Sequence, residues 1–214
     1  VQEMADFVGI AFDLAFKYRN PAIILADGVI GQMMEKVVLP EQRTRLTDEE
    51  VIARCPWATT GRTHHRTPNI ITSLELDPAE MEKRNIHLQK KYAEIEENEV
   101  RFEELHCEDA EYLIVAFGSC ARIAQKAMEM AREEGIKVGL LRPITLWPFP
   151  SKAIAARAAQ VKGILTVELN AGQMVEDVRL AVECKVPVEH FGRLGGIVPD
   201  PDEVITALKE KLIK

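Results

Sequence analysis

The spacing of apolar residues predicts a helix and then a strand at the start of the chain. Apolar positions recur every three or four residues through residues 1–19, which is the pattern of an amphipathic helix. Asn20 and Pro21 end this helix, and the apolar run Ala22–Ala26 predicts a buried strand. Two elements cannot form a sheet that is covered on both faces, so we expect the neighbouring strands to precede Val1 in a longer parent chain. The absence of an initiator methionine agrees with this expectation.

The second half of the chain alternates short apolar runs with amphipathic segments. Three apolar runs predict strands that are buried on both faces, as in a parallel sheet: Leu113–Phe117, Val138–Leu141 and Gly163–Leu169. A fourth, shorter strand is predicted at Val186–Phe191. Helices are predicted between and after them, at residues 119–134, 151–161, 174–184 and 202–213. Ser119 is expected to cap the first of these helices and Gly135 to end it. The repeat predicts an α/β domain that begins near residue 107.

A polar segment connects the two α/β parts. Residues 40–76 show no regular period, and a connection of this length is usually functional or a domain linker. Asp77–Glu80 is a strong helix start, because it offers an N-cap, a proline at the first helical position and a capping-box glutamate. The helix that follows has a thin apolar seam from Met81 to Phe102 and many glutamates, which predicts a solvated connector between domains.

The composition narrows the classes of function. The formal net charge is −7 at pH 7 and comes largely from one acidic region, so we do not expect the chain to bind nucleic acid. No apolar run approaches the roughly 20 residues that a membrane span needs, and no signal peptide opens the chain, so we expect no membrane association and a cytoplasmic location. The cysteines are dispersed without a CxxC pair, which argues against an iron–sulfur cluster or a zinc site in this chain.

The irregular segment contains a basic cluster, Arg62, His64, His65 and Arg66. Two arginines near the hydrogen-bond donors of Thr59, Thr60 and Gly61 could bind a carboxylate or a phosphate, because a guanidinium donates two parallel hydrogen bonds to such groups. The alternative is a solvated loop. A metal site is not predicted, since adjacent histidines point apart in a strand and do not have the spacing of helical ligand pairs.

Further candidate residues follow the strands of the second half. Ser119 and Cys120 place a hydroxyl, a thiol and free N–H groups at a helix start, which favours a phosphate or carboxylate and would lower the pKa of a thiol. The alternative is capping by the serine and packing by the small residues. Arg142 ends the second of these strands, where it can bind an anionic ligand or pair with Glu168 on the next strand, and we favour the pair.

Two more polar residues lie at strand ends. Asn170 belongs to the polar group after the third strand of the second half, and ligands of open α/β sheets bind at this edge. Asp27 ends the run at the start of the chain, where a carboxylate could bind magnesium on a cofactor diphosphate. We favour a simple turn there, because no second metal ligand such as an asparagine follows in Val29–Leu39. These patterns assign no catalytic and no metal-binding residue to this chain.

Long segments of the sequence resemble the alpha subunit of the 2-oxoacid:ferredoxin oxidoreductases. GSCARIAQKAMEMAREEGIKVGLLRPITLWPFP, VELNAGQMVEDVRLAV and GRLGG resemble its C-terminal half. YRNPAIILADGVIGQMME resembles the end of its pyrimidine-binding domain, so the resemblance covers nearly the whole chain. It implies an α/β fold in three parts: the truncated end of the thiamine pyrimidine-binding domain (1–39), a linker loop with an acidic helix (40–106), and a transketolase C-terminal-like parallel-sheet domain (107–214).

The resemblance implies an enzyme complex that oxidatively decarboxylates a 2-oxoacid with thiamine diphosphate and coenzyme A, giving an acyl-CoA, carbon dioxide and reduced ferredoxin. The WATTG linker is similar to the ketoisovalerate type, which favours 2-ketoisovalerate over 2-oxoglutarate. The family places thiamine diphosphate and its magnesium on the beta subunit, and iron–sulfur clusters in partner chains such as the ferredoxin-like gamma and delta subunits. We therefore expect a hetero-oligomer in which this piece is inactive alone, with Arg142–Pro150 and Asn170–Met174 serving assembly or lining the entrance for substrate or coenzyme A.

Two other classes remain open. One is a different thiamine enzyme, such as a transketolase or the beta subunit of a 2-oxoacid dehydrogenase. The other is a non-catalytic module that only dimerises or serves as a scaffold. Reduction of ferredoxin by the full complex separates the first class from the family, and the oligomeric state of the isolated chain tests the second.

Overall fold

The computed structural model describes residues 1–59, 61 and 69–213 of the chain. These residues form two compact units. The N-terminal unit comprises Val1–Ala26 and Gly31–Tyr92, and the C-terminal unit comprises Asp27–Ile30 and Ala93–Lys214. No helix in the described ranges has the length and apolarity that crossing a membrane requires.

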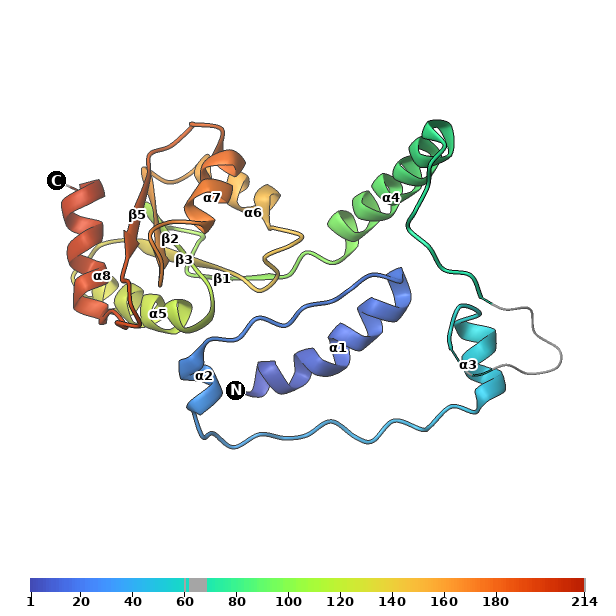
Figure 1. Cartoon of the computed structure of the whole chain (residues 1–214). Helices are drawn as coiled ribbons and strands as arrows, with labels where there is room; N and C mark the ends of the chain where they lie inside the picture. The colour runs from blue at the N-terminus through green and yellow to red at the C-terminus, as the bar shows by residue number, and fades with distance from the viewer. Residues whose placement is uncertain (60, 62–68, 214) are drawn as a thin grey trace. The chain divides into compact units, whose positions relative to one another are not determined.

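The C-terminal unit is built on a five-stranded sheet with the order β1-β3-β2-β4-β5. Strands β1, β2, β3 and β5 are labelled in Figure 1. The strands of the sheet are β1 (Phe102–Leu105), β2 (Tyr112–Ala116), β3 (Val138–Pro143), β4 (Gly163–Glu168) and β5 (Val188–Gly192). The last four pair in parallel, and only β1 runs antiparallel, against β3. The sheet confirms the predicted α/β fold class, because its four parallel strands are those that the apolar runs indicated.

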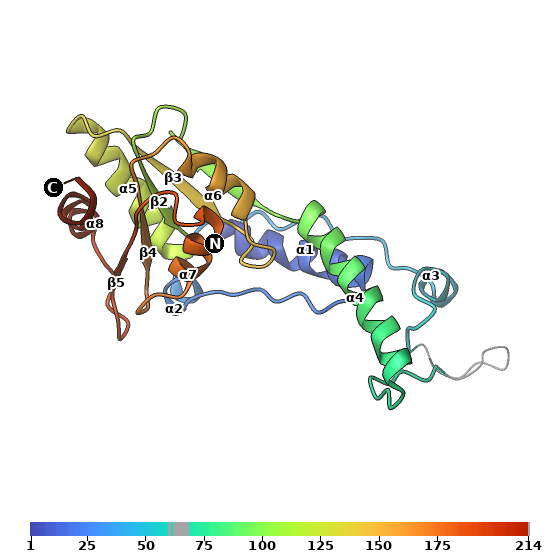
Figure 2. The ribbon, with the colours of Figure 1, turned by 90° about the horizontal axis from the view of Figure 1, so that it is seen from above.

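Helices cover both faces of this sheet, as Figure 2 shows. They are α5 (Gly118–Glu133) and α8 (Pro201–Leu208) on one face, and α6 (Ser151–Ala158) and α7 (Met174–Val182) on the other. A short π-helix, Lys209–Ile213, continues α8. Because successive side chains of a strand point to opposite faces, Ile114 packs towards α5 while Leu113 and Val115 pack towards α6 and α7. This double coverage explains why the central strands β2, β3 and β4 read as largely apolar runs.

The edge strand β1 is the part of the sheet that the sequence pattern did not predict. We expected the acidic helix to reach Phe102, but α4 (Pro78–Asn98) ends at Asn98 and the chain then pairs with the open edge of β3. Glu103 and Glu104 are therefore strand residues with arginine partners, Arg142 and Arg157, and are not part of a solvated helix surface.

The N-terminal unit confirms one predicted element and contradicts another. Helix α1 (Gln2–Tyr18) forms as predicted. The run Ala22–Ala26 is not a strand: Ile23 is 80% exposed and Leu25 is 67% exposed. The reason is physical, since the described residues of this unit contain no strand beside this run, and a single strand leaves its N–H and C=O groups unpaired.

Two short helices lie in segments for which we predicted none. Helix α2 (Gly28–Gln32) follows Asp27, and α3 (Asp48–Arg54) lies inside the segment expected to be irregular. Thr47 and Glu50 form a capping box at the start of α3, a signal that was present in the sequence.

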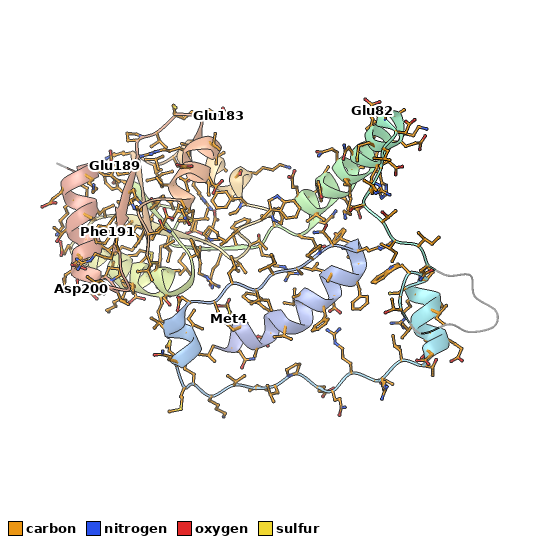
Figure 3. The ribbon with its side chains drawn as sticks, in the orientation of Figure 1. Met4, Glu82, Glu183, Glu189, Phe191 and Asp200 are labelled. Carbon is orange, nitrogen blue, oxygen red and sulfur yellow. The ribbon has the colours of Figure 1, made fainter. Side chains whose placement is uncertain are left out.

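The predicted start of the long acidic helix is confirmed. The Asp77 carboxylate accepts hydrogen bonds from the N–H groups of Ala79, at 2.8 Å, and Glu80, at 3.1 Å. Glu82, labelled on α4 in Figure 3, is one of its exposed acidic side chains.

Candidate functional site

The candidate site lies where the strand order of the parallel sheet reverses. The chain leaves β2 towards β3 on one side, and it leaves β4 towards β5 on the other. Ligands of open α/β sheets bind at the carboxyl ends of the strands at such a point. Here these ends are Gly118–Cys120 after β2 and Glu168–Asn170 after β4, so three predicted residues, Ser119, Cys120 and Asn170, fall at this place.

The carboxylate of Asp27 bridges the starts of two helices at this edge. Its Oδ1 accepts the N–H of Ile30 in α2 at 2.8 Å, and its Oδ2 accepts the hydroxyl of Ser119 in α5 at 2.6 Å.

The prediction that Ser119 caps α5 is therefore wrong: Ser119 lies inside the helix, and Phe117 is the N-cap without a side-chain hydrogen bond. Gly118, at φ 58°, makes the turn from β2 into α5.

These contacts set the charge of Asp27. Partial burial acts to raise its pKa and is the largest single effect. The hydrogen bonds from the Ser119 hydroxyl and from the backbone N–H groups of Ile30, Val29 and Ser119 outweigh it together, so the pKa of Asp27 lies below its usual value. Asp27 is thus an ionised cap. This agrees with the interpretation of Asp27 as part of a turn, and it shows that the carboxylate also joins the starts of α2 and α5.

Cys120 is a core residue and not an activated thiol. It is 4% exposed and packs with the cluster between α5 and the sheet. Burial, followed by the negative charges of Glu168 and Asp27, raises its pKa to about 11. The expected lowering by the helix start is wrong, because the side chain points into the apolar core and faces two carboxylates.

Glu168 holds the start of α7. Its side chain is almost fully buried, with 1% of the residue exposed. The carboxylate accepts the backbone N–H groups of Gln173, Met174 and Val175 at 3.1, 2.8 and 3.0 Å. Three donors at a helix N-terminus compensate the cost of burying the charge.

The expected ion pair between Arg142 and Glu168 does not form. Arg142 Nε instead donates to Glu103 Oε2 on the edge strand at 2.9 Å. The sheet order explains the difference, because β2 lies between β3, which carries Arg142, and β4, which carries Glu168. Pairing across two strand spacings, about 10 Å, is beyond a direct contact.

The two helix starts at this edge are therefore occupied by carboxylates of the chain itself, Asp27 at α5 and Glu168 at α7. A helix start normally attracts phosphate, but here the N–H groups and their positive potential are already used. The described residues at this edge do not fit a diphosphate or a divalent cation held by it. Within the described ranges, no group of three or more His, Cys, Asp or Glu side chains is arranged to hold a metal ion.

Asn170 lies in the turn that follows β4. Its Oδ1 accepts the N–H of Gly172 at 2.7 Å, which closes a tight turn, and its main-chain carbonyl faces Nε2 of His190 at 3.3 Å. Among the residues that the structure describes, none accepts a hydrogen bond from the side-chain nitrogen of Asn170. A carboxamide N–H group is a suitable donor to carboxylate, carbonyl or phosphate oxygens.

Sequence reasoning missed His190 and the bridging role of Asp27. His190 lies in the middle of a strand without a motif around it, and the partners of Asp27 lie far along the chain, so no local signal marks them. Arg62 and Arg66, the other predicted anion-binding residues, lie outside the described residues.

Two family models match the chain. Residues 1–106 match "Pyruvate flavodoxin/ferredoxin oxidoreductase, thiamine diP-bdg". Residues 110–204 match "Pyruvate:ferredoxin oxidoreductase core domain II". Both models belong to one group of enzymes, and their order along the chain agrees with the order of the two resemblances in the sequence.

Curated relatives match almost the whole chain. The ketoisovalerate oxidoreductase subunit VorB of Methanothermobacter marburgensis is 45% identical over 210 residues, which are 98% of this chain and 58% of that protein. The 2-oxoglutarate synthase subunit KorA of Archaeoglobus fulgidus is 31% identical over 203 residues, which are 94% of this chain and 56% of that protein. The chain thus spans less than two thirds of the length of these relatives.

A solved structure shares the fold. It is the 2-oxoglutarate:ferredoxin oxidoreductase from Magnetococcus marinus with 2-oxoglutarate, coenzyme A and succinyl-CoA bound. The match has a TM-score of 0.57 and 26% identity, and it covers 64% of this chain and 24% of that chain.

The two family models name one class of protein, the pyruvate:ferredoxin oxidoreductases, and they match successive parts of this chain. The chain belongs to the 2-oxoacid:ferredoxin oxidoreductase family, and this confirms the resemblance that the sequence motifs carried.

Proposed function

We propose that this chain is part of the alpha subunit of a complex that oxidatively decarboxylates a 2-oxoacid. The reaction converts R–CO–COO⁻, coenzyme A and two oxidised ferredoxins into R–CO–S-CoA, CO₂, two reduced ferredoxins and a proton. The observation that carries the proposal is the 45% identity to a ketoisovalerate oxidoreductase subunit over 98% of this chain.

The same comparison supports 2-ketoisovalerate as the substrate. The identity to 2-oxoglutarate synthase subunits is lower, at 29% and 31% for two of them. The two substrates differ in the group that the enzyme must recognise: one carries an apolar isopropyl group and the other a second carboxylate. A site built for the apolar group excludes the charged one, because burying an unpaired carboxylate is costly.

We assign this chain a supporting role in the reaction, without a catalytic or a metal-binding residue of its own. Thiamine diphosphate and magnesium would be bound by the beta subunit, and the iron–sulfur clusters by gamma and delta subunits. The carboxylates of Asp27 and Glu168, which cap α5 and α7, support this assignment. They lie at the carboxyl edge of the sheet, where a diphosphate would need hydrogen-bond donors. The piece is then inactive alone.

The proposed parts of the chain are the end of a pyrimidine-binding domain at 1–39, a linker at 40–106 and a transketolase C-terminal-like domain at 107–214. Within them we propose Asn170 as the residue that meets a substrate, with Arg62, Arg66 and Arg142 as further anion-binding candidates. Ser119 and Cys120 complete the set of candidates; the first donates to Asp27 and the second is packed in the core.

The test is an assay of the full-length subunit reassembled with its partner subunits. Viologen reduction is followed with coenzyme A across a panel of 2-oxoacids, with thiamine diphosphate omitted as a control. We expect reduction with 2-ketoisovalerate that requires both coenzyme A and thiamine diphosphate. Preference for 2-oxoglutarate would correct the substrate, and no reduction with any 2-oxoacid would leave a transketolase-like or scaffold role.

A further inference from the structure

His190 lies on β5, next to the turn that follows β4. It pairs with Thr166 across the β4–β5 ladder, and its ring nitrogens lie near Thr166, Glu168 and Asn170. Nδ1 lies 3.2 Å from Thr166 Oγ1 and 3.4 Å from Glu168 Oε1, and Nε2 lies 3.3 Å from the carbonyl oxygen of Asn170. On the same strand, the neighbours Glu189 and Phe191 are labelled in Figure 3.

The chemistry of these partners determines where the ring protons lie. A carbonyl oxygen only accepts, so Nε2 must carry a proton to bind Asn170. At Nδ1 the Thr166 hydroxyl can either donate to the ring or turn its proton to the Glu189 carbonyl, 3.3 Å away. The bond to the Asn170 carbonyl therefore exists in the neutral ring and in the charged ring, because both can hold a proton on Nε2.

Two glycines leave the space that this contact requires. A Cβ atom on Gly192 would lie 2.2 Å from the Asn170 carbonyl oxygen and 2.6 Å from His190 Nε2. Gly172 has φ 112°, a conformation that side chains disfavour, and a Cβ there would lie 3.1 Å from a methyl group of Val175. Glycine at both positions lets the turn approach β5 closely enough for the histidine to bind it.

We propose that His190 is a positioning residue that holds the turn Asn170–Gln173, through its Nε2–H bond to the Asn170 carbonyl, so that the Asn170 carboxamide can bind a substrate oxygen. The inference rests on the proposed function for the identity of that substrate. The ligand chemistry is a carboxylate, carbonyl or phosphate oxygen, supplied by the 2-oxoacid or by coenzyme A, and the two are separated by their KM values.

Two variants of similar size separate this role from general packing. In His190→Gln the amide nitrogen can take the place of Nε2, so the bond to Asn170 is kept. In His190→Asn the shorter amide reaches only the Nδ1 side, towards Thr166 and Glu168. In the reassembled complex we expect His190→Asn to raise the KM of one substrate by roughly three- to tenfold, the effect of one lost hydrogen bond, with kcat changed less than twofold. We expect His190→Gln to stay within about twofold of wild type. His87→Asn, on the exposed surface of α4, is the control.

A second readout does not depend on activity. Hydrogen exchange of the N–H groups of Gly172–Val175 in the full complex is expected to be faster in His190→Asn than in His190→Gln. If wild type is inactive with every 2-oxoacid, the proposed function fails, while this exchange comparison still tests the histidine. Equal KM values or equal exchange in the two variants would overturn the proposal.

Asn170→Ala provides a test that does not alter His190. It keeps the carbonyl that the histidine binds and removes the carboxamide, so we expect the same KM to rise while the exchange of Met174 and Val175 stays as in wild type. If both KM values stay unchanged, Asn170 does not bind a substrate and the proposal is overturned.

Discussion

Asp27 and Glu168 hold the starts of three helices with two carboxylates. Asp27 serves α2 and α5, and Glu168 serves α7. Each charge is stabilised by backbone N–H groups that would otherwise lack partners. At the scale of single residues, the two carboxylates at this edge are therefore satisfied by the helix starts of the chain itself.

Replacing Asp27 should weaken the C-terminal unit in a pH-dependent way. At pH 7 we expect Asp27→Ala to lower the free energy of unfolding by about 0.5–2 kcal/mol, the cost of a lost cap, and Asp27→Asn by less because an amide still accepts. The pKa of Asp27 is lower in the folded chain than in the unfolded chain. The carboxylate therefore stabilises the fold fully above the unfolded pKa of about 4, and this stabilisation is lost as the pH falls through the folded pKa.

The measurement for Asp27 is urea unfolding of wild type and variants between pH 3 and pH 7. The difference between wild type and Asp27→Ala should shrink as the pH falls. Glu96→Gln, an exposed position on α4, should show no such trend. A difference that stays constant with pH would show that the charge of Asp27 does not contribute.

The three thiols of the C-terminal unit, Cys107, Cys120 and Cys184, should differ sharply in reactivity. Burial raises the pKa of Cys107 and of Cys120 to about 11, while Cys184 is exposed. At pH 8 a thiol of pKa 11 is roughly 0.1% thiolate, so both should resist iodoacetamide in the folded chain. Mass spectrometry after brief labelling should find Cys184 modified first. Equal labelling of Cys120 and Cys184 under native conditions would contradict the buried position of Cys120.

At the scale of elements, the edge strand β1 is held by side-chain contacts as well as by its backbone ladder with β3. Arg157 in α6 donates through Nε and Nη2 to both oxygens of Glu104, at 2.9 and 2.6 Å, and Nη1 reaches the Cys107 carbonyl at 3.4 Å. This paired geometry is specific to a guanidinium. Arg157 therefore ties β1 and the turn after it to the helical layer.

Removing the guanidinium of Arg157 should loosen β1. Arg157→Ala is expected to cost about 1–3 kcal/mol in unfolding free energy, as for hydrogen bonds to a charged group, and Arg157→Lys should recover only part of it. Lys162→Ala, which breaks an exposed pair with Glu111, should change stability little. Chemical denaturation measures all three, and equal values for Arg157→Lys and wild type would contradict the paired geometry.

The elements also show what the sequence could and could not reveal. Leu113–Phe117, Val138–Leu141 and Gly163–Leu169 were predictable, because strands buried on both faces are largely apolar. The run Val186–Phe191 carries Glu189 and His190, and β5 is accordingly only half-buried. β1 was not predictable, since Phe102–Leu105 is half acidic and its pairing depends on the distant edge of β3. At the candidate site, the position of Asn170 followed from the strand rule, while His190 and the partners of Asp27 depend on contacts between residues far apart in sequence.

At the scale of the whole molecule, the two units differ in how much core they contain. The C-terminal unit has two apolar clusters, one on each face of its sheet. Among the described residues of the N-terminal unit, Tyr18 and Cys55 are the buried hydrophobic side chains, while Phe12 and Phe16 on α1 are more than half exposed. Burial of apolar surface is the main favourable term in folding, so stability should be concentrated in the C-terminal unit.

A fragment of residues 93–214 should therefore fold alone. We expect it to unfold in one cooperative thermal transition, because it retains the sheet and both clusters, although it lacks Asp27–Ile30 and the first part of α4. A fragment of residues 1–92 should show helical circular dichroism without a cooperative transition. Circular dichroism melts test both, and a non-cooperative melt of 93–214 would contradict the assignment of the core.

The most direct test of the central claim is the stoichiometry of the reassembled complex with 2-ketoisovalerate. The account predicts one CO₂ and one acyl-CoA for every two ferredoxins reduced, with no turnover when this subunit, thiamine diphosphate or coenzyme A is left out. Turnover without ferredoxin reduction, or full activity without this subunit, would contradict it.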